Sequence, residues 1–257
     1  ITGSIGLGAT LSALAAGNKV ALANKESLVA GGDLVMKYSR DQIIPVDSEH
    51  SALFQCLQGA PPNSIDKLIL TASGGPFRTT PIEALASVTP QQALKHPTWN
   101  MGGLVTINSS TLMNKGLEII EARWLFDVPT NSVDVIVHPQ SIVHSFVQYK
   151  DGSILGQLGL PDMRLPIQYA LLYPERVNTD LPLLDLSSMS ALTFEKHDET
   201  KFPSIRIARE AAKIGGTMPA VMNAANEAAV GLFLDEEITY LGIMETVERV
   251  MGNHSTI

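Results

Sequence analysis

Short apolar runs alternate with polar or glycine-rich segments along the first third of the chain. Residues 19–32 contain an apolar run, a polar turn and a helical pattern, and the apolar runs at 43–47 and 67–75 also end in polar or glycine residues. This alternation predicts strands followed by helices, and therefore an α/β fold with a mainly parallel sheet. Sheets of this kind bind ligands at the carboxyl ends of their strands. Three polar residues directly follow the predicted strand ends: Lys25, Asp47 and Ser73.

The rest of the chain changes character several times. Residues 76–103 contain four prolines and little periodicity, which predicts a long loop with a short helix inside, and such loops are often lids. Residues 132–159 are rich in β-branched residues and include a "KDGS" turn, so antiparallel strands are expected. Residues 171–199 are irregular. Residues 202–238 are helical, with a break at Gly215–Gly216.

Residues 108–126 have the clearest helical pattern, and Ser109 or Ser110 suits the N-cap. Two readings stay open for the polar face of this helix. It could be a solvated face with a Lys115–Glu118 pair worth a few tenths of a kcal/mol. Alternatively it binds an anion, because backbone N–H groups near a helix start favour phosphate. The polar face consists of Asn114, Lys115, Glu118 and Glu121.

The segment "PVDSEHSA" places two carboxylates directly after a predicted buried strand. A helix start explains this pattern, since Asp47 or Ser48 suits an N-cap and acidic residues suit a first turn. A metal site explains it as well, because residues two apart in an extended segment point the same way. In that reading Asp47 and Glu49 converge on one cation, and Glu118 offers a third hard oxygen ligand for Mg²⁺ or Mn²⁺.

Composition excludes some functions. The net charge of −8, without a Lys/Arg-rich run, argues against nucleic acid as a partner. The single cysteine, Cys56, cannot form an internal disulfide, and no thiol cluster offers a zinc site. No apolar run reaches about 18 residues, so a membrane span is not expected. The chain begins at Ile1 without a methionine and opens in an apolar pattern, so we expect a piece of a longer protein.

Several other polar residues are weak candidates when each is taken alone. Lys25, Ser73 and His96 all have ordinary structural explanations as turn or packing residues. His138 and His144 are six residues apart, which is not metal-ligand spacing, so both are expected to be structural. The opening "TGSIGLG" is not the G-x-G-x-x-G dinucleotide fingerprint, and no strand precedes it.

Eight separated motifs together resemble one enzyme family, and they run through essentially the whole chain in its order and spacing. The family is 1-deoxy-D-xylulose 5-phosphate reductoisomerase. The motifs are "ALANKESLVAGG", "PVDSEHSA", "LTASGGPFR", "HPTWNMG", "NSSTLMNKGLEIIEARWLF", "VHPQSIVHS", "PDMRLPI" and "NAANEAAV".

The resemblance implies an activity and a set of partners. Members convert 1-deoxy-D-xylulose 5-phosphate, a phosphorylated ketose, to 2-C-methyl-D-erythritol 4-phosphate on the non-mevalonate route to isoprenoids. They use NADPH and a divalent cation, Mg²⁺ or Mn²⁺. They are homodimers that bind neither nucleic acid nor membrane. A bacterial cytoplasmic location is expected, and a plastid location stays open.

The resemblance also implies how the chain is divided. Residues 1–46 would be the C-terminal part of a Rossmann-like NADPH-binding domain, whose own glycine loop lies further upstream in the family. Residues 47–172 would be a central α+β catalytic and dimerisation domain. A linker would cover residues 173–198. Residues 199–257 would be part of a C-terminal helical domain.

Residue by residue, the resemblance assigns roles within the site. The expected metal ligands are Asp47, Glu49 and Glu118. The expected catalytic residues are Lys25, Glu49 and His96. The expected substrate contacts are Lys25, Ser48, Glu49, Ser73, His96, Ser109, Asn114, Lys115 and Glu118. The expected NADPH contacts are Asn24, Glu26 and Gly102.

One residue departs from the family pattern, and two other kinds of function remain open. Leu104 stands where many members have lysine, so a positive charge near the lid would be lost. One alternative is a metal-dependent sugar-phosphate isomerase or aldolase without redox chemistry. The other is a fragment without catalytic activity that retains metal and sugar-phosphate binding.

Overall fold

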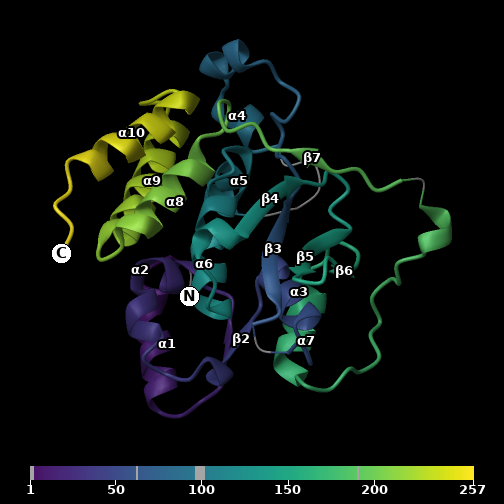
Figure 1. Ribbon diagram of the computed structural model, residues 1–257. Coiled ribbons are helices and arrows are strands. Elements are labelled where there is room, and N and C mark those ends of the chain that lie inside the picture. The colour runs from purple at the N-terminus through teal and green to yellow at the C-terminus, as the bar shows by residue number, and fades with distance from the viewer. Residues whose placement is uncertain (1–2, 62, 96–101, 190) are drawn as a thin grey trace.

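The structure is a computed structural model that describes residues 3–61, 63–95, 102–189 and 191–257 (Figure 1). Its first part is a small α/β unit in which two short strands pair in parallel, with Val20 opposite Ile43. The predicted strand, turn and helix over residues 19–32 are confirmed. The elements of this unit are α1 (Gly6–Ala15), β1 (Val20–Leu22), α2 (Lys25–Val35), the 3₁₀ turn Arg40–Gln42 and β2 (Ile43–Pro45).

A five-stranded mixed sheet forms the middle of the described chain, in the order β6-β5-β3-β4-β7. The antiparallel pair expected within residues 132–159 is confirmed for β5 and β6. The expectation of antiparallel pairing is wrong for β4, which runs parallel to β3. The chain between β3 and β4 is a long helical crossover, which parallel strands require. The strands are β3 (Ile65–Ala72), β4 (Val133–Val137), β5 (Val143–Tyr149), β6 (Ile154–Leu158) and β7 (Glu195–Lys196).

Helices cover this sheet and bury its apolar side chains. Helix α3 packs on β5 and β6, whereas α6 packs on β3 and β4. The three C-terminal helices lie beside α6, on its side away from β5 and β6 (Figure 1). The predicted break at Gly215–Gly216 is confirmed. The helices are α3 (Ser48–Cys56), α4 (Pro90–Ala93), α5 (Gly103–Ser110), α6 (Met113–Phe126), α7 (Arg164–Leu172), α8 (Ser204–Ile214), α9 (Met218–Leu234) and α10 (Tyr240–Gly252).

One apolar core joins the sheet to α6 and to the C-terminal helices. Leu70 of β3, Ile120 of α6 and Phe233 of α9 belong to it, and each is 0–1% exposed. Burial of such side chains stabilises the fold by roughly 1.5–3 kcal/mol each. Helix α6 is therefore fixed on two sides. Within the described ranges, no helix combines the length and apolarity that a bilayer span requires.

The segment predicted as one helix over residues 108–126 consists of two helices. Helix α5 ends at Ser110, and α6 begins at Met113 after Leu112, which has a left-handed backbone (φ 61°, ψ 12°). Neither serine is therefore an N-cap. Leucine rarely adopts this conformation, and its side chain is 2% exposed, so tertiary packing holds the turn against local preference.

The segments expected to be irregular contain some short regular elements. The long segment 76–103 includes a 3₁₀ turn (Ile82–Ser87), α4 and the first residue of α5. The part of its expected lid that contains His96, residues 96–101, lies outside the described ranges. Two further 3₁₀ turns are Thr130–Ser132 and Leu186–Ser188, and the second lies in the segment predicted to be irregular.

Helices α2 and α6 approach so closely at Gly32 that a side chain there would collide with Trp124. A Cβ atom at Gly32 would lie 2.2 Å from Trp124 Nε1. We expect Gly32→Ala to lower the free energy of unfolding by about 1–3 kcal/mol, because the half-buried Trp124 ring, which packs against the core, must move. Chemical denaturation measures this change.

The matched control for this prediction is Gly231→Ala, in the interior of α9. A Cβ at Gly231 meets nothing within 4 Å, so alanine should raise the free energy of unfolding by about 0.5–1 kcal/mol. A Gly32→Ala protein that is as stable as this control would show that α2 and α6 do not pack as described.

Candidate active site

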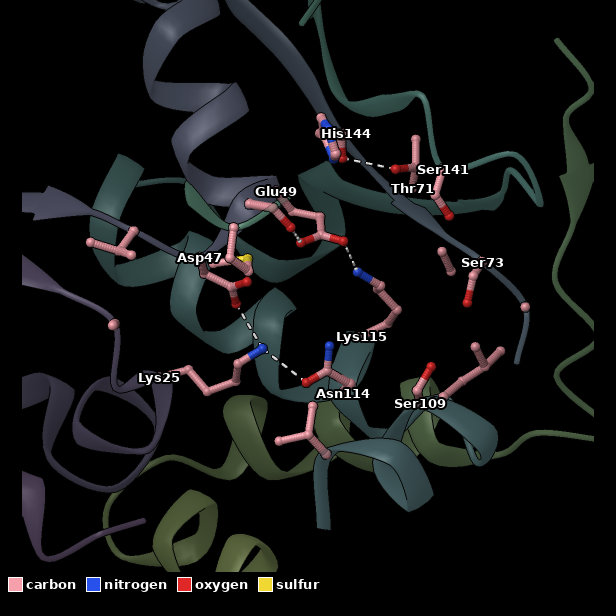
Figure 2. A pocket seen from close by; sticks show the side chains of 18 residues that line it. Lys25, Asp47, Glu49, Thr71, Ser73, Ser109, Asn114, Lys115, Ser141 and His144 are labelled. Carbon is pink, nitrogen blue, oxygen red and sulfur yellow. Dashed lines mark hydrogen bonds and ion pairs between the residues drawn. The ribbon is translucent and has the colours of Figure 1, made fainter. Parts of the chain in front are cut away.

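The ends of β1, β2 and β3 open onto one cavity of about 300 Å³. Lys25 begins α2 after β1, Asp47 precedes α3 after β2, and Ser73 follows β3. Figure 2 shows their side chains around the cavity together with residues of α5 and α6. Nine of the residues singled out by sequence are brought together here. They are Lys25, Asp47, Ser48, Glu49, Ser73, Ser109, Asn114 and Lys115, which line the cavity, and Glu118, which lies buried beneath it.

Residues 47–49 combine the two readings that the sequence left open. Asp47 is the N-cap of α3 by position, but its side chain makes no capping hydrogen bond within the described structure. Its Oδ2 atom instead lies 2.7 Å from Lys25 Nζ. Glu49 is in the first turn of α3, where its Oε2 accepts a hydrogen bond of 2.6 Å from Ser48 Oγ. The extended geometry expected for this segment is therefore wrong, although a helix start brings the two carboxylates together as well.

The carboxylates of Asp47, Glu49 and Glu118 form a compact cluster. One oxygen of each lies within 4.8 Å of the others. Hard oxygen atoms at this spacing are the ligand set that Mg²⁺ and Mn²⁺ prefer, so the residues fit such a cation.

Two lysine ammonium groups neutralise this cluster. Lys25 Nζ lies 2.7 Å from Asp47 and 3.2 Å from Glu118, and it donates a hydrogen bond of 2.8 Å to Asn114 Oδ1. Lys115 Nζ is paired with Glu49 and lies 2.6 Å from Glu118 Oε2. A divalent cation must therefore compete with two bound ammonium groups for the same oxygen atoms.

The charges in the cluster shift each other's pKa. Burial acts to raise the pKa of Asp47, but Lys25 and His50 outweigh it and hold that pKa well below its usual range. Burial acts to lower the pKa of Lys25, but Asp47 and Glu118 raise it well above the ordinary value. For Glu118, burial and the nearby Glu49 raise the pKa. Asp47 and Lys25 are therefore charged at neutral pH, which suits a site that binds a cation beside an anionic ligand.

A second buried layer lies behind Asp47. His50 is fully buried, and its Nε2 donates to the carbonyl oxygen of Glu118 at 2.9 Å. Its Nδ1 lies 3.3 Å from Glu121 Oε2 and 3.6 Å from Asp47 Oδ2. Burial acts to lower the pKa of His50, but the nearby Glu121 and Asp47 raise it above its usual value. Burial raises the pKa of Glu121, against the opposite effect of His50.

The sequence placed Glu121 on a polar face but gave no sign of this contact. With 1% of its surface exposed, it is as buried as the core, and the reading of a solvated face for α6 is wrong. A polar position that alternates with apolar ones looks the same whether it faces water or a buried charge.

Hydroxyl groups line the side of the cavity opposite Asp47. Figure 2 shows Ser73 and Ser109 close together beyond Lys115. The close approach depends on Gly75 (φ 66°), because a Cβ there would lie 3.0 Å from the Ser109 carbonyl oxygen. The cavity thus has a charged side and a hydroxyl-lined side, which suits a ligand with both metal-binding oxygens and a phosphate.

His144 is a lining residue that sequence reasoning missed. It was expected to be structural, like His138, yet it lines the cavity while being only 6% exposed. Burial lowers the pKa of His144, so its imidazole is neutral at pH 7. His138 is fully buried, and its Nδ1 lies 2.9 Å from the Thr193 carbonyl oxygen. The spacing of the two histidines along the chain could not have separated these outcomes.

The residues expected to bind NADPH are not among those that line the cavity. Asn24 caps α2, since its Oδ1 accepts hydrogen bonds from Ser27 N at 2.8 Å and Ser27 Oγ at 2.6 Å. Glu26 lies in the first turn of α2, and Gly102 is the exposed N-cap of α5. Leu104 is half-buried and packs against the main core.

Sequence profiles of three known domains match this chain. They are described as 1-deoxy-D-xylulose 5-phosphate reductoisomerase (residues 1–32), 1-deoxy-D-xylulose 5-phosphate reductoisomerase C-terminal domain (residues 43–126) and DXP reductoisomerase C-terminal domain (residues 158–257). The enzyme of this name from Heliobacterium modesticaldum is 58% identical over 99% of the chain and 66% of its own length. That from Chlorobium limicola is 54% identical over 99% of the chain and 67% of its own length. The chain belongs to the 1-deoxy-D-xylulose 5-phosphate reductoisomerase family.

Solved structures of reductoisomerases agree with this membership. The enzyme from Zymomonas mobilis in complex with NADPH has a TM-score of 0.93 at 47% identity, over 99% of this chain and 67% of that one. A reductoisomerase in complex with NADPH, fosmidomycin and magnesium has a TM-score of 0.93 at 43% identity, over 98% of this chain and 65% of that one. The family resemblance and the mixed α/β fold are therefore confirmed. The chain spans about 66% of the length of the first curated relatives that it matches.

Proposed function

We propose that the protein to which this chain belongs converts 1-deoxy-D-xylulose 5-phosphate to 2-C-methyl-D-erythritol 4-phosphate with NADPH and a divalent cation. The observation that carries this proposal is the cluster of Asp47, Glu49 and Glu118 beside a hydroxyl-lined wall in one cavity. A ketose phosphate has oxygen atoms that can bind a cation held by the carboxylate cluster, and a phosphate that can bind at the hydroxyl-lined wall. The NADPH and magnesium named for the solved relatives support the same assignment.

Asp47, Glu49 and Glu118 would hold the Mg²⁺ or Mn²⁺. When bound, such a cation polarises substrate oxygen atoms and orients them. Lys25 lies at the edge of this cluster and adds positive charge where negative charge develops on oxygen. Ser48 hydrogen-bonds to Glu49 and so orients that carboxylate.

The remaining residues in the proposal bind the substrate or the cofactor. Ser73, Ser109, Asn114 and Lys115 would hold the phosphate side of the ketose, with His96, which lies outside the described residues, closing the site. We assign catalytic roles to Lys25, Glu49 and His96. Three residues at the starts of α2 and α5 would contact NADPH: Asn24, Glu26 and Gly102.

The domain organisation implied by the sequence is part of this proposal. Residues 1–46 would belong to the NADPH-binding domain, residues 47–172 to the catalytic domain, and residues 199–257 to a helical domain after a linker at 173–198. Within the described chain, β1 and β2 form a two-stranded sheet. Dinucleotide-binding sheets of this class use several parallel strands and a glycine-rich loop.

The experiment that tests the function follows ligand binding and NADPH oxidation by these 257 residues. We expect the chain to bind Mn²⁺ and the ketose phosphate, but to oxidise NADPH far more slowly than the full-length relative from Heliobacterium modesticaldum. A rate close to that of the relative would contradict this expectation. Conversion of the ketose phosphate without NADPH would instead favour an isomerase or aldolase. Absence of ketose phosphate binding would overturn the proposed function.

We also propose that the protein is a homodimer in the bacterial cytoplasm, as the family resemblance implies. Strand β6 ends one side of the five-stranded sheet, and its residues Ile154 and Leu155 are 52% and 51% exposed. Strand edges with exposed apolar residues tend to pair with another chain. Sedimentation at the mass of a monomer would contradict the dimer.

A further inference from the structure

The turn between α5 and α6 connects the two halves of the proposed phosphate site. We call residues 110–113 the α5–α6 turn. Ser109 precedes it, and Asn114 and Lys115 follow it. The last carbonyl groups of a helix have no partners within that helix, so the end of α5 needs hydrogen-bond donors from elsewhere. The position of this turn sets the distance between the Ser109 hydroxyl and the polar groups of α6.

Each of the three C-terminal helices donates one buried side-chain hydrogen bond to this region. Tyr240 Oη of α10 donates to the carbonyl oxygen of Ser110 at 2.7 Å. Ser204 Oγ of α8 donates to the carbonyl oxygen of Thr111 at 2.7 Å. From α9, Asn226 Nδ2 donates to the side chain of Asn108 at 2.9 Å. The donors are 0–3% exposed, so no water replaces a lost bond without opening the core.

The opposite side of the turn packs closely against the loop after β3. The loop after β3 carries Ser73 and approaches α5 at Gly75, where a Cβ would lie 3.0 Å from both the Ser109 carbonyl oxygen and the Ser110 Cα. The turn therefore lies between the loop after β3, which carries Ser73, and the helices α8, α9 and α10, which supply the three donors.

We propose that Tyr240 is a positioning residue for phosphate binding, acting through the Ser110 carbonyl group on the placement of Ser109 and Asn114. This inference rests on the proposed function, which assigns the phosphate to this side of the cavity. The ring of Tyr240 packs against Phe77 and Phe233, with centroids 5.1 and 5.8 Å away. Phenylalanine keeps that packing and removes the hydroxyl alone, so Tyr240→Phe isolates the hydrogen bond.

A control with the same kind of hydrogen bond exists on β5, at a tyrosine that is half-buried. Tyr149 Oη also donates to a backbone carbonyl group, that of Cys56, at 2.8 Å. Tyr149 is not a lining residue of the cavity, so Tyr149→Phe removes the same kind of bond without touching the turn. Ser204→Ala is a second, independent variant, because it removes another donor to the same turn.

The experiment measures the dissociation constants of inorganic phosphate, 1-deoxy-D-xylulose 5-phosphate and Mn²⁺ for the wild type and the three variants. We expect Tyr240→Phe and Ser204→Ala to weaken binding of both phosphate ligands about 3- to 10-fold, the effect of one hydrogen bond. Binding of Mn²⁺ should change less than phosphate binding, since Asp47 and Glu49 lie at the start of α3 and Glu118 lies further along α6 than Asn114 and Lys115. Tyr149→Phe should change none of the three constants.

The outcomes separate this inference from the proposed function. If Tyr240→Phe binds inorganic phosphate as tightly as Tyr149→Phe does, or loses Mn²⁺ affinity to the same degree as phosphate affinity, the positioning role is overturned. If the wild type binds inorganic phosphate but not the ketose phosphate, the proposed function fails while the variants still test the turn. A wild type that binds neither overturns both.

Discussion

Replacing Glu49 by glutamine is expected to weaken Mn²⁺ binding by about 100-fold or more. Outer-shell partners of a metal site are worth roughly 10- to 100-fold in affinity, and a direct carboxylate ligand should be worth at least as much. The neutral amide loses the negative charge but keeps the shape, so α3 should still form. Electron paramagnetic resonance of free Mn²⁺ during a titration measures the dissociation constant.

The control for this substitution is Glu248→Gln on α10. Glu248 is also in an ion pair, with Arg206 Nη2 at 2.6 Å, but it lies outside the cavity. We expect its loss to leave Mn²⁺ binding unchanged. Equal effects of the two substitutions would show that Glu49 is not a ligand.

Glu121 cannot serve as this control, although it lies one helical turn beyond Glu118. The structure places it 3.3 Å from His50 Nδ1, and His50 in turn faces Asp47. Asp47, His50 and Glu121 also offer ligand atoms within 4.8 Å of one another. A Glu121→Gln protein should therefore show an intermediate loss of Mn²⁺ affinity, since the support of a ligand changes rather than the ligand itself.

The second large effect is expected at Lys115, where methionine removes the charge and keeps the buried methylene chain. In saturating Mn²⁺, Lys115→Met should weaken binding of 1-deoxy-D-xylulose 5-phosphate roughly 10- to 150-fold. This is the effect of losing a charge-assisted hydrogen bond of about 1.5–3 kcal/mol. Isothermal titration calorimetry measures it, with the sugar that lacks the phosphate as the control ligand.

Mn²⁺ binding gives an independent check on Lys115. Its ammonium group is paired with Glu49 and Glu118, the carboxylates that a cation would use. Removing this competitor should leave the affinity for Mn²⁺ equal to that of the wild type or higher. If the sugar and its phosphate lose affinity by the same factor, Lys115 does not bind the phosphate.

The sequence by itself determined much of the local structure. Apolar runs predicted β1, β2 and β3, and the polar residues directly after them, Lys25, Asp47 and Ser73, were predicted as site residues. Both predictions were possible because a strand end is marked by a change of composition within a few residues. The break before α9 was predicted for the same reason, since Gly215 and Gly216 are adjacent in the chain. Eight motifs then sufficed to identify the family.

Tertiary structure alone decided which of these residues meet and which are buried. Glu49 pairs with Lys115 from 66 positions away, and Tyr240 bonds to Ser110 across 130 positions. Contacts at such separations leave no periodic signal in a single sequence. The break at Leu112 was missed because buried packing holds leucine in a conformation that its local preference opposes. The sequence left open whether the polar face of α6 is solvated or binds a ligand, because alternation of polar and apolar residues does not distinguish water from a buried charge.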